Sequence, residues 1–183
     1  MARFPGRLAL LLLLLPAVTS PGSQLIPRSL EELSTSAERI VMARCVSAAP
    51  QWNADHSQIL TAYRFRVTRT LKGEASPAIT LDELGGFVDG KGMMVGDVPC
   101  YTVGEEVLLF AARTEIGRWR TLGAGQGKFT LIRDPQGRSW VRNDFYRCEL
   151  AQMSPDRTPG HGAPLEVFAG HVLAPLSSRR VNP

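Results

Sequence analysis

The sequence predicts a mainly β protein, either a small antiparallel barrel or a sandwich, and two observations carry this prediction. The first is the stretch from Ile59 to Gly73, in which Tyr63, Phe65 and Val67 alternate with polar residues. This period of two is typical of a strand with one buried face, and aromatic and β-branched residues favour strands. The second is the spacing of turn signals, about every eight to twelve residues, which favours antiparallel strands over alternating strands and helices.

The other elements follow in order along the chain. Ser29 and Glu32 form the pattern of a capping box, which predicts a short helix near residues 30–36. Apolar or alternating stretches predict further strands at residues 39–46, 78–84, 107–112, 118–122, 128–132 and 139–142. Polar or glycine-rich segments at residues 50–57, 72–77, 85–99 and 123–127 are expected as the turns and loops between them.

The C-terminal part of the chain is predicted to be a linker followed by a helix. Residues 154–163 are rich in proline, glycine and polar residues. Pro164 then suits the first turn of a helix in which Leu165, Phe168 and Val172 share one stripe. We therefore expect a barrel domain at residues 28–150, and a linker, a short helix and a flexible tail at residues 151–183.

The N-terminus has the three parts of a secretory signal peptide. Arg3 and Arg7 give a positive start, Leu8 to Leu15 form an uninterrupted apolar run, and Pro16 ends it before small residues. This run is too short to span a membrane. We expect a signal peptide at residues 1–20, no membrane anchor in the mature chain, and a secreted or periplasmic location.

The charge of the predicted mature chain is close to neutral. The full sequence has 21 Lys and Arg residues, 17 Asp and Glu residues and a formal net charge of +4. Without Arg3 and Arg7, 19 basic residues remain against 17 acidic ones. This small excess does not indicate a dedicated polyanion-binding protein, and nucleic acid is an unfavoured partner.

Several segments between residues 37 and 132 resemble a known class of proteins. The segments are ERIVMARCV, TAYRFRVTRTLKG, ITLDELGG, YTVGEEVLLFA, RWRTLG and GQGKFTLI. In this order they resemble a group of secreted bacterial proteins of uncharacterised function, whose layout is similar to the netrin-like barrel of tissue inhibitors of metalloproteinases (TIMP-like). The resemblance implies a small antiparallel OB-type barrel of five strands, which protects its edges by curling. The predicted fold is therefore mainly β, an OB-type barrel with short N-terminal and C-terminal helices.

The chain departs from those inhibitors at its N-terminus. Their mature chains begin with a cysteine whose amino group and carbonyl chelate the zinc ion of the protease. The first cysteine in this sequence is Cys45, so the inhibitory segment is missing. The resemblance implies the fold alone, and fold does not imply function.

The chain has three cysteines, Cys45, Cys100 and Cys148. The odd number and wide spacing are unlike a zinc site of paired cysteines. In an oxidising compartment one internal bridge at most can form. Because Cys45 lies in a predicted buried strand, we favour a disulfide between Cys100 and Cys148.

No pattern in the sequence indicates catalysis, a cofactor or a metal. His56, His161 and His171 are isolated and lack ligand spacing, so each is expected to face solvent. No GxSxG motif provides a nucleophile. The glycine-rich segment 122–128 fails as a phosphate-binding loop, because Phe129 stands where such a loop has Ser or Thr. We therefore expect a protein that is not an enzyme.

Two surfaces are candidates for binding. Arg64, Arg66 and Arg69 make the polar side of the long strand basic, and OB barrels bind single strands or sugars with such faces. The simpler interpretation, which we favour, is a solvated face whose arginine stems cover apolar neighbours. The other surface is the loop at residues 85–99, which carries the apolar residues Phe87, Val88, Met93, Met94 and Val95. Exposed apolar residues on a loop often mark contact surfaces, although these residues could instead fold back and plug one end of the barrel.

The predicted function is a secreted, non-catalytic binding module that contacts an extracellular protein such as a metalloprotease. Two alternatives stay open at this point. One is an oligosaccharide- or nucleic-acid-binding barrel that uses the arginine face. The other is a hydrolase whose site forms only in the fold.

Overall fold

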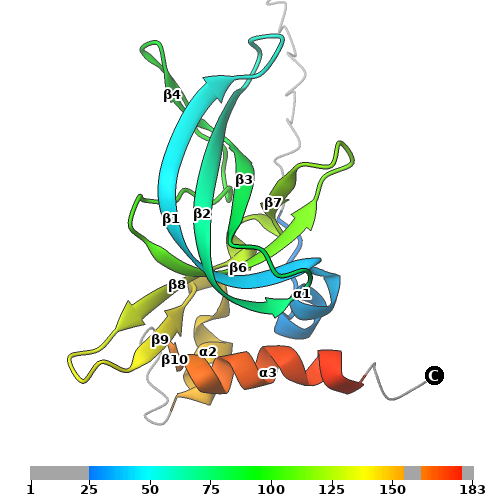
Figure 1. Cartoon of the computed structure of the whole chain (residues 1–183), viewed down its shortest axis with the longest axis vertical. Helices are drawn as coiled ribbons and strands as arrows, with labels where there is room; N and C mark the ends of the chain where they lie inside the picture. Colours follow the sequence, from blue (N-terminus) through cyan, green and yellow to red (C-terminus); the bar gives the residue numbers. More distant parts are fainter. Residues whose placement is uncertain (1–24, 155–161, 179–183) are drawn as a thin grey trace, which may run out of the picture.

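The computed structural model describes residues 25–154 and 162–178 and shows a mainly β protein with helices at one end (Figure 1). The strands are β1 (Arg39–Trp52), β2 (Ile59–Lys72), β3 (Ala78–Leu84), β4 (Gly86–Val88), β5 (Lys91–Met93), β6 (Glu106–Arg113), β7 (Trp119–Thr121), β8 (Lys128–Arg133), β9 (Ser139–Arg142) and β10 (Ala163–Pro164). The helices are α1 (Leu30–Ser36), α2 (Arg147–Met153) and α3 (Leu165–Ser178), with 3-10 turns η1 (Ala124–Gly127) and η2 (Asp144–Tyr146). The predicted signal peptide lies outside the described residues.

All strands except β4 and β5 belong to one antiparallel sheet. Its order is β10-β9-β8-β6-β1-β2-β3, and β7 pairs with the end of β6 that β8 leaves free. Strands β1 and β2 have 14 residues each, and their pairing contains three register shifts. Bulges of this kind bend strands and increase their twist. This explains why β1 and β2 form a long curved pair in Figure 1, with the small β4–β5 hairpin beside their far end.

Within the described residues, no strand ladder closes the curled sheet into a barrel. Strand β3 is the last in the order, and β7 lies across a seam from it. Side chains bridge this seam: Arg118 pairs with Asp82 at 3.1 Å, and Arg120 Nε donates to the Asp82 carbonyl at 3.0 Å. The Thr121 N–H donates to the Glu83 carboxylate at 2.7 Å. The mainly β antiparallel fold is thus confirmed, whereas the predicted barrel is an open sheet with a polar seam.

The sheet separates two hydrophobic cores because alternate residues of β1 and β6 point to opposite sides. Ile40 and Phe110 point toward the helices, whereas Val41 and Leu109 point into the curl of the sheet. The helix-covered core also contains Leu30, Leu33, Leu108, Phe129, Val141, Tyr146, Leu150, Leu165, Phe168 and Val172. The curled-sheet core also contains Ala43, Cys45, Tyr63, Phe65, Ile79, Leu81, Tyr101, Val107 and Ala111.

The terminal helices form where the sequence predicts them. Helix α1 begins with the capping box: the Ser29 hydroxyl accepts from the Glu32 N–H, and the Glu32 carboxylate accepts from the Ser29 N–H. In α3, the predicted stripe of Leu165, Phe168 and Val172 is buried in the helix-covered core. No helix within residues 25–154 and 162–178 has the length and apolar composition that crossing a membrane requires.

Three segments differ from the prediction. Strand β1 continues to Trp52, because the expected loop shrinks to a tight turn in which the Asn53 side chain accepts from the N–H groups of Ser57 and Gln58. The expected loop at residues 85–99 contains the β4–β5 hairpin. In the expected linker, Ala163–Pro164 pair with β9, and helix α2 precedes the segment without an obvious signal in the sequence.

Side chains fix the described N-terminal segment to the sheet. Gln126, which is 2% exposed, accepts from the Arg28 N–H at 2.8 Å and donates to the Ile26 carbonyl at 3.0 Å. The Tyr146 hydroxyl donates to the Arg28 carbonyl at 2.8 Å. These bonds satisfy backbone groups that pair with no strand, and so position the start of α1.

Candidate functional site

The β4–β5 hairpin and the residues after it present apolar side chains to solvent. Phe87 is 66% exposed, Met94 97% and Val95 38%. Val88 and Met93, the other two apolar residues predicted for this loop, are half-buried. Part of the loop therefore packs against the molecule, while three of its apolar side chains stay in contact with water.

The base of this hairpin is fixed to strand β2. The Gly85 N–H donates to the Ile59 carbonyl at 2.8 Å, and the Thr61 hydroxyl donates to the Gly85 carbonyl at 2.6 Å. A side chain at Gly86, whose φ is +138°, would collide with Thr61 and Pro50. Glycine thus allows the hairpin to lie directly against the strand pair.

Contacts with the β1–β2 turn support the hairpin tip. Trp52 Nε1 donates to the Asp89 carboxylate at 3.3 Å, and the Lys91 ammonium lies 5.8 Å from the centre of the Trp52 ring. His56 stacks on Trp52, with ring centroids 6.0 Å apart. The β1–β2 turn therefore supports the hairpin tip from the face that carries Lys91, whereas Phe87, paired with Gly92, points to the other face.

The predicted basic face divides into free and paired arginines. Arg64 and Arg66 are exposed, and no carboxylate within the described residues pairs with them. Arg69 instead pairs with Glu166 of α3 at 3.5 Å. Arg44 of β1, which the sequence analysis did not select, lies directly opposite Arg66. Met42 and Arg44 alternate with apolar residues along β1, and this alternation could have placed Arg44 on the polar face.

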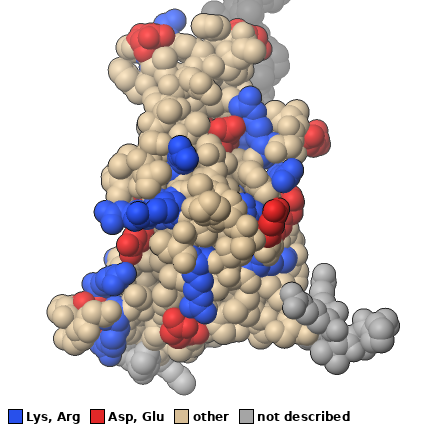
Figure 2. Space-filling model, in the orientation of Figure 1, with Lys and Arg blue, Asp and Glu red and all other residues tan. Residues whose placement is uncertain are grey.

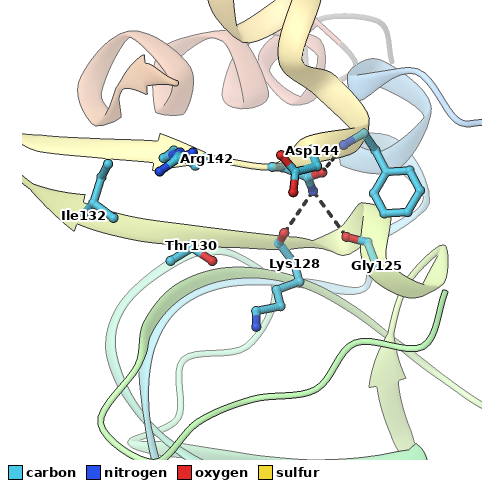
Figure 3. A pocket seen from close by; sticks show the side chains of 8 residues that line it. Gly125, Lys128, Thr130, Ile132, Arg142 and Asp144 are labelled. Carbon is cyan, nitrogen blue, oxygen red and sulfur yellow. Dashed lines mark hydrogen bonds between the residues drawn. The ribbon is translucent and has the colours of Figure 1, made fainter. Parts of the chain in front are cut away.

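A shallow pocket of about 330 Å³ lies on the open face of β8 and β9 (Figure 3). The residues that line it are Gly125, Lys128, Thr130, Ile132, Arg142, Asn143, Asp144 and Phe145. The Asn143 amide donates to the carbonyls of Gly125 and Lys128, and its oxygen accepts from the Phe145 N–H. Both polar atoms of the Asn143 side chain are therefore engaged in joining η1, β8 and η2 at this pocket.

The remaining polar groups of this pocket are engaged or exposed. Lys128 turns away from β9 in Figure 3 and pairs with Glu105 at 2.8 Å, and Thr130 also donates to Glu105. Arg142 is exposed, and Asp144 lies 4.0 Å from Arg147. The polar side chains of the pocket are therefore held mainly by neighbouring residues of the chain.

A buried carboxyl group lies at the seam between β3 and β7. Glu83 is 4% exposed, and its carboxylate accepts from both the N–H and the hydroxyl of Thr121 at 2.7 Å. The Thr121 hydroxyl in turn lies 2.5 Å from the hydroxyl of buried Tyr101. Removal from water raises the pKa of Glu83 to about 7, while the hydrogen bonds from Thr121 and the charge of Arg120 act in the opposite direction. Burial likewise raises the pKa of Tyr101 well above its usual value.

The signal for Glu83 was present in the sequence. Ile79, Leu81 and Glu83 alternate along β3, and all three side chains point inward. A charged residue on the apolar side of an alternating strand indicates a buried polar site.

The three cysteines and the two histidines that the structure describes do not gather into a site. Cys45 is buried, whereas Cys100 and Cys148 are exposed and free, so the predicted disulfide between them is not present. His56 and His171 are exposed, as predicted, and His161 lies outside the described residues. No three His, Cys, Asp or Glu side chains in the described part of the chain gather as a metal ion would require.

Comparison of the chain with protein-family models, with curated proteins and with solved structures gave no match. No relative therefore assigns a role to any of the residues above. The resemblance to the netrin-like barrel stays a prediction from the sequence.

Proposed function

We propose that this protein is a secreted, non-catalytic interaction module that binds a partner protein through the β4–β5 hairpin and the residues that follow it. The observation that carries this proposal is the exposure of Phe87, Met94 and Val95 on a supported hairpin. Export rests on the apolar run and positive start of residues 1–20.

Exposed apolar side chains favour contact with another protein because their burial removes them from water. Fully burying a Phe or Met side chain contributes about 1.5–3 kcal/mol. Phe87 and Met94 are close enough in the chain to enter one interface, and Asp89 and Lys91 supply polar groups around them. Because hydrogen bonds to β2 already fix the hairpin, binding would order few additional residues, which lowers the entropic cost.

The proposed architecture is an OB-type module of the netrin-like kind, as the sequence resemblance implies. Strands β1, β2, β3, β6 and β7 curl around one apolar core, and the seam is crossed by side chains rather than by a ladder. An extracellular metalloprotease is the partner class that the sequence resemblance implies. The first cysteine is Cys45, so zinc chelation by an N-terminal cysteine is not the expected mode of contact.

The test is affinity capture from the exported proteins of the producing cell, with the mature chain as bait. The double variant Phe87→Ser/Met94→Ser should reduce capture of the specific partner about tenfold or more, which corresponds to about 1.4 kcal/mol or more. Ile116→Ser is the matched control, because Ile116 is 78% exposed in the turn between β6 and β7. Urea unfolding of each variant establishes that its fold is unchanged.

The outcomes distinguish specific binding by the hairpin from nonspecific adsorption through any exposed apolar residue. A partner retained by wild type and Ile116→Ser but lost by the double variant supports the proposal. Equal capture by all three proteins, or no specific capture by wild type, contradicts it. Adding purified metalloproteases to the same assay tests the partner class separately.

A further inference from the structure

The outer face of β1 and β2 carries three neighbouring arginines. Arg44 of β1 lies directly opposite Arg66 of β2, and Arg64 lies two residues along β2 on the same side. All three are exposed, because Ala43, Cys45 and the intervening β2 residues point into the curled-sheet core. Figure 2 shows several separate groups of Lys and Arg atoms on this side of the molecule, with Asp and Glu atoms beside some of them.

This arrangement has an electrostatic cost. Like charges directly opposite on neighbouring strands destabilise a sheet, whereas opposite charges stabilise it. Arg44, Arg64 and Arg66 form no ion pair within the described residues, although nearby Arg69 pairs with Glu166. The closest acidic residue in register is Glu106, opposite Arg44, and its carboxylate pairs with Arg133 at 3.7 Å.

The spacing of these arginines suits a chain of anionic groups. Neighbouring strands lie about 4.8 Å apart, and residues two apart in a strand are separated by about 6.8 Å. Each guanidinium offers a planar pair of N–H donors that matches a carboxylate or sulfate. The exposed Ser47, opposite Arg64, and Thr80, on the other side of Arg64, add hydroxyl groups to the same face.

We propose that this face binds an acidic polysaccharide, whose carboxylate or sulfate groups contact Arg44, Arg64 and Arg66. Binding to single-stranded nucleic acid usually adds stacking of bases on exposed aromatic rings. The aromatic residues of this part of β2, Tyr63 and Phe65, are buried on the opposite side. The face therefore offers charge and hydroxyl groups without a stacking platform, which favours a polysaccharide over nucleic acid.

A membrane surface fits this face less well. Peripheral binding to anionic lipid combines basic residues with large apolar side chains that enter the lipid boundary. Beside the three arginines, the large apolar side chain that β1 exposes is Val46, which is 43% exposed. The larger exposed side chains, Phe87 and Met94, belong to the hairpin and not to this face.

The experiment measures binding of the mature chain to polygalacturonate and to dextran sulfate at low ionic strength, with neutral dextran as the uncharged probe. Arg64→Gln/Arg66→Gln should weaken binding about tenfold or more and make it less dependent on salt, because fewer counterions are released. Arg138→Gln/Arg147→Gln is the matched control. It removes the same charge from exposed positions elsewhere and should lower affinity less than threefold.

Each outcome decides the proposal. Binding to either acidic polysaccharide that the Arg64/Arg66 variant loses and the control keeps supports it. The absence of binding to both polysaccharides, or equal losses in the two variants, overturns it. Tighter binding to a single-stranded oligonucleotide or to anionic lipid vesicles also overturns it. The hairpin variant Phe87→Ser/Met94→Ser should bind polysaccharide unchanged, so this result is independent of the proposed function.

Discussion

The two cores of the molecule are closed in different ways. The helix-covered core is closed by apolar packing, and Phe129 lies at its centre with its ring 5.4 Å from Phe110, 5.5 Å from Tyr146 and 4.7 Å from Phe168. The curled-sheet core also contains packed rings, since the ring centroid of Tyr101 lies 5.0 Å from that of Tyr63 and 4.9 Å from that of Phe65. Its open side, however, is closed by hydrogen bonds that include the buried carboxyl group of Glu83.

The two cores should therefore respond differently to pH. Apolar packing does not depend on proton concentration, whereas a buried carboxyl group with a raised pKa does. Both proposed binding surfaces belong to the curled half of the molecule, on β1, β2 and the β4–β5 hairpin. In both proposals the curled half would present side chains to other molecules, and the helix-covered half would be its base.

The strongest test of this comparison is Phe129→Ala. Phe129 is fully buried, and its removal should leave a cavity that destabilises the protein by about 3–5 kcal/mol. Urea unfolding measures this change in the free energy of unfolding. The control Phe87→Ala, at a residue 66% exposed, should change it by less than about 0.5 kcal/mol. Equal effects of the two substitutions would show that Phe129 is not part of a packed core.

Glu83→Gln tests the polar seam through its pH dependence. The pKa of Glu83 is raised from 4.5 to about 7, so the folded protein holds a proton that the unfolded chain has already released. This contribution to stability is complete below pH 4.5 and is lost as the pH rises through about 7. We expect wild type to lose about 2 kcal/mol from this group between pH 5 and pH 8.

The Glu83→Gln variant should lack this loss, because the amide does not titrate. Urea unfolding at several pH values measures it, and Glu106→Gln is the control because the Glu106 side chain is 40% exposed and pairs with Arg133 at 3.7 Å. A wild-type stability that does not change with pH, or a change that persists in Glu83→Gln, would place the titrating group elsewhere.

Ser29→Ala gives the smallest expected effect and tests the N-cap of α1, a helix that packs on the helix-covered core. The Ser29 hydroxyl accepts from the Glu32 N–H at 3.1 Å at the start of α1, whose Leu30 and Leu33 are buried. Loss of this cap should cost about 1 kcal/mol in thermal or urea unfolding. Ser36→Ala, at the exposed end of the same helix, should have little effect. Similar costs at both positions would argue against a specific cap.

Local patterns predicted most of the elements. The alternation around Tyr63 and Phe65 predicted β2, and the capping box at Ser29 predicted α1 within one residue. These patterns work because side-chain direction in strands and hydrogen bonding at helix ends depend on near neighbours. Helix α2 carries no comparable signal, and its position depends on packing against α3 and β10.

The candidate surfaces were predictable only in part. The loop with Phe87 and Met94 stood out because its apolar residues follow several glycines. Arg69 was expected to join Arg64 and Arg66, but a residue 97 positions away, Glu166, pairs with it, and Arg44 takes its place. A pairing over such a distance has no signature in a single sequence.

The order of residues alone determined that this chain forms antiparallel strands with one apolar side, because the direction of each side chain follows from its place in the pleat. Only the folded chain decided that the sheet stays open, with Glu83 and Thr121 joining β3 to β7, because strand closure depends on how far distant segments bend toward each other. The same bending decided which arginines lie opposite one another and which apolar side chains of the hairpin remain in water.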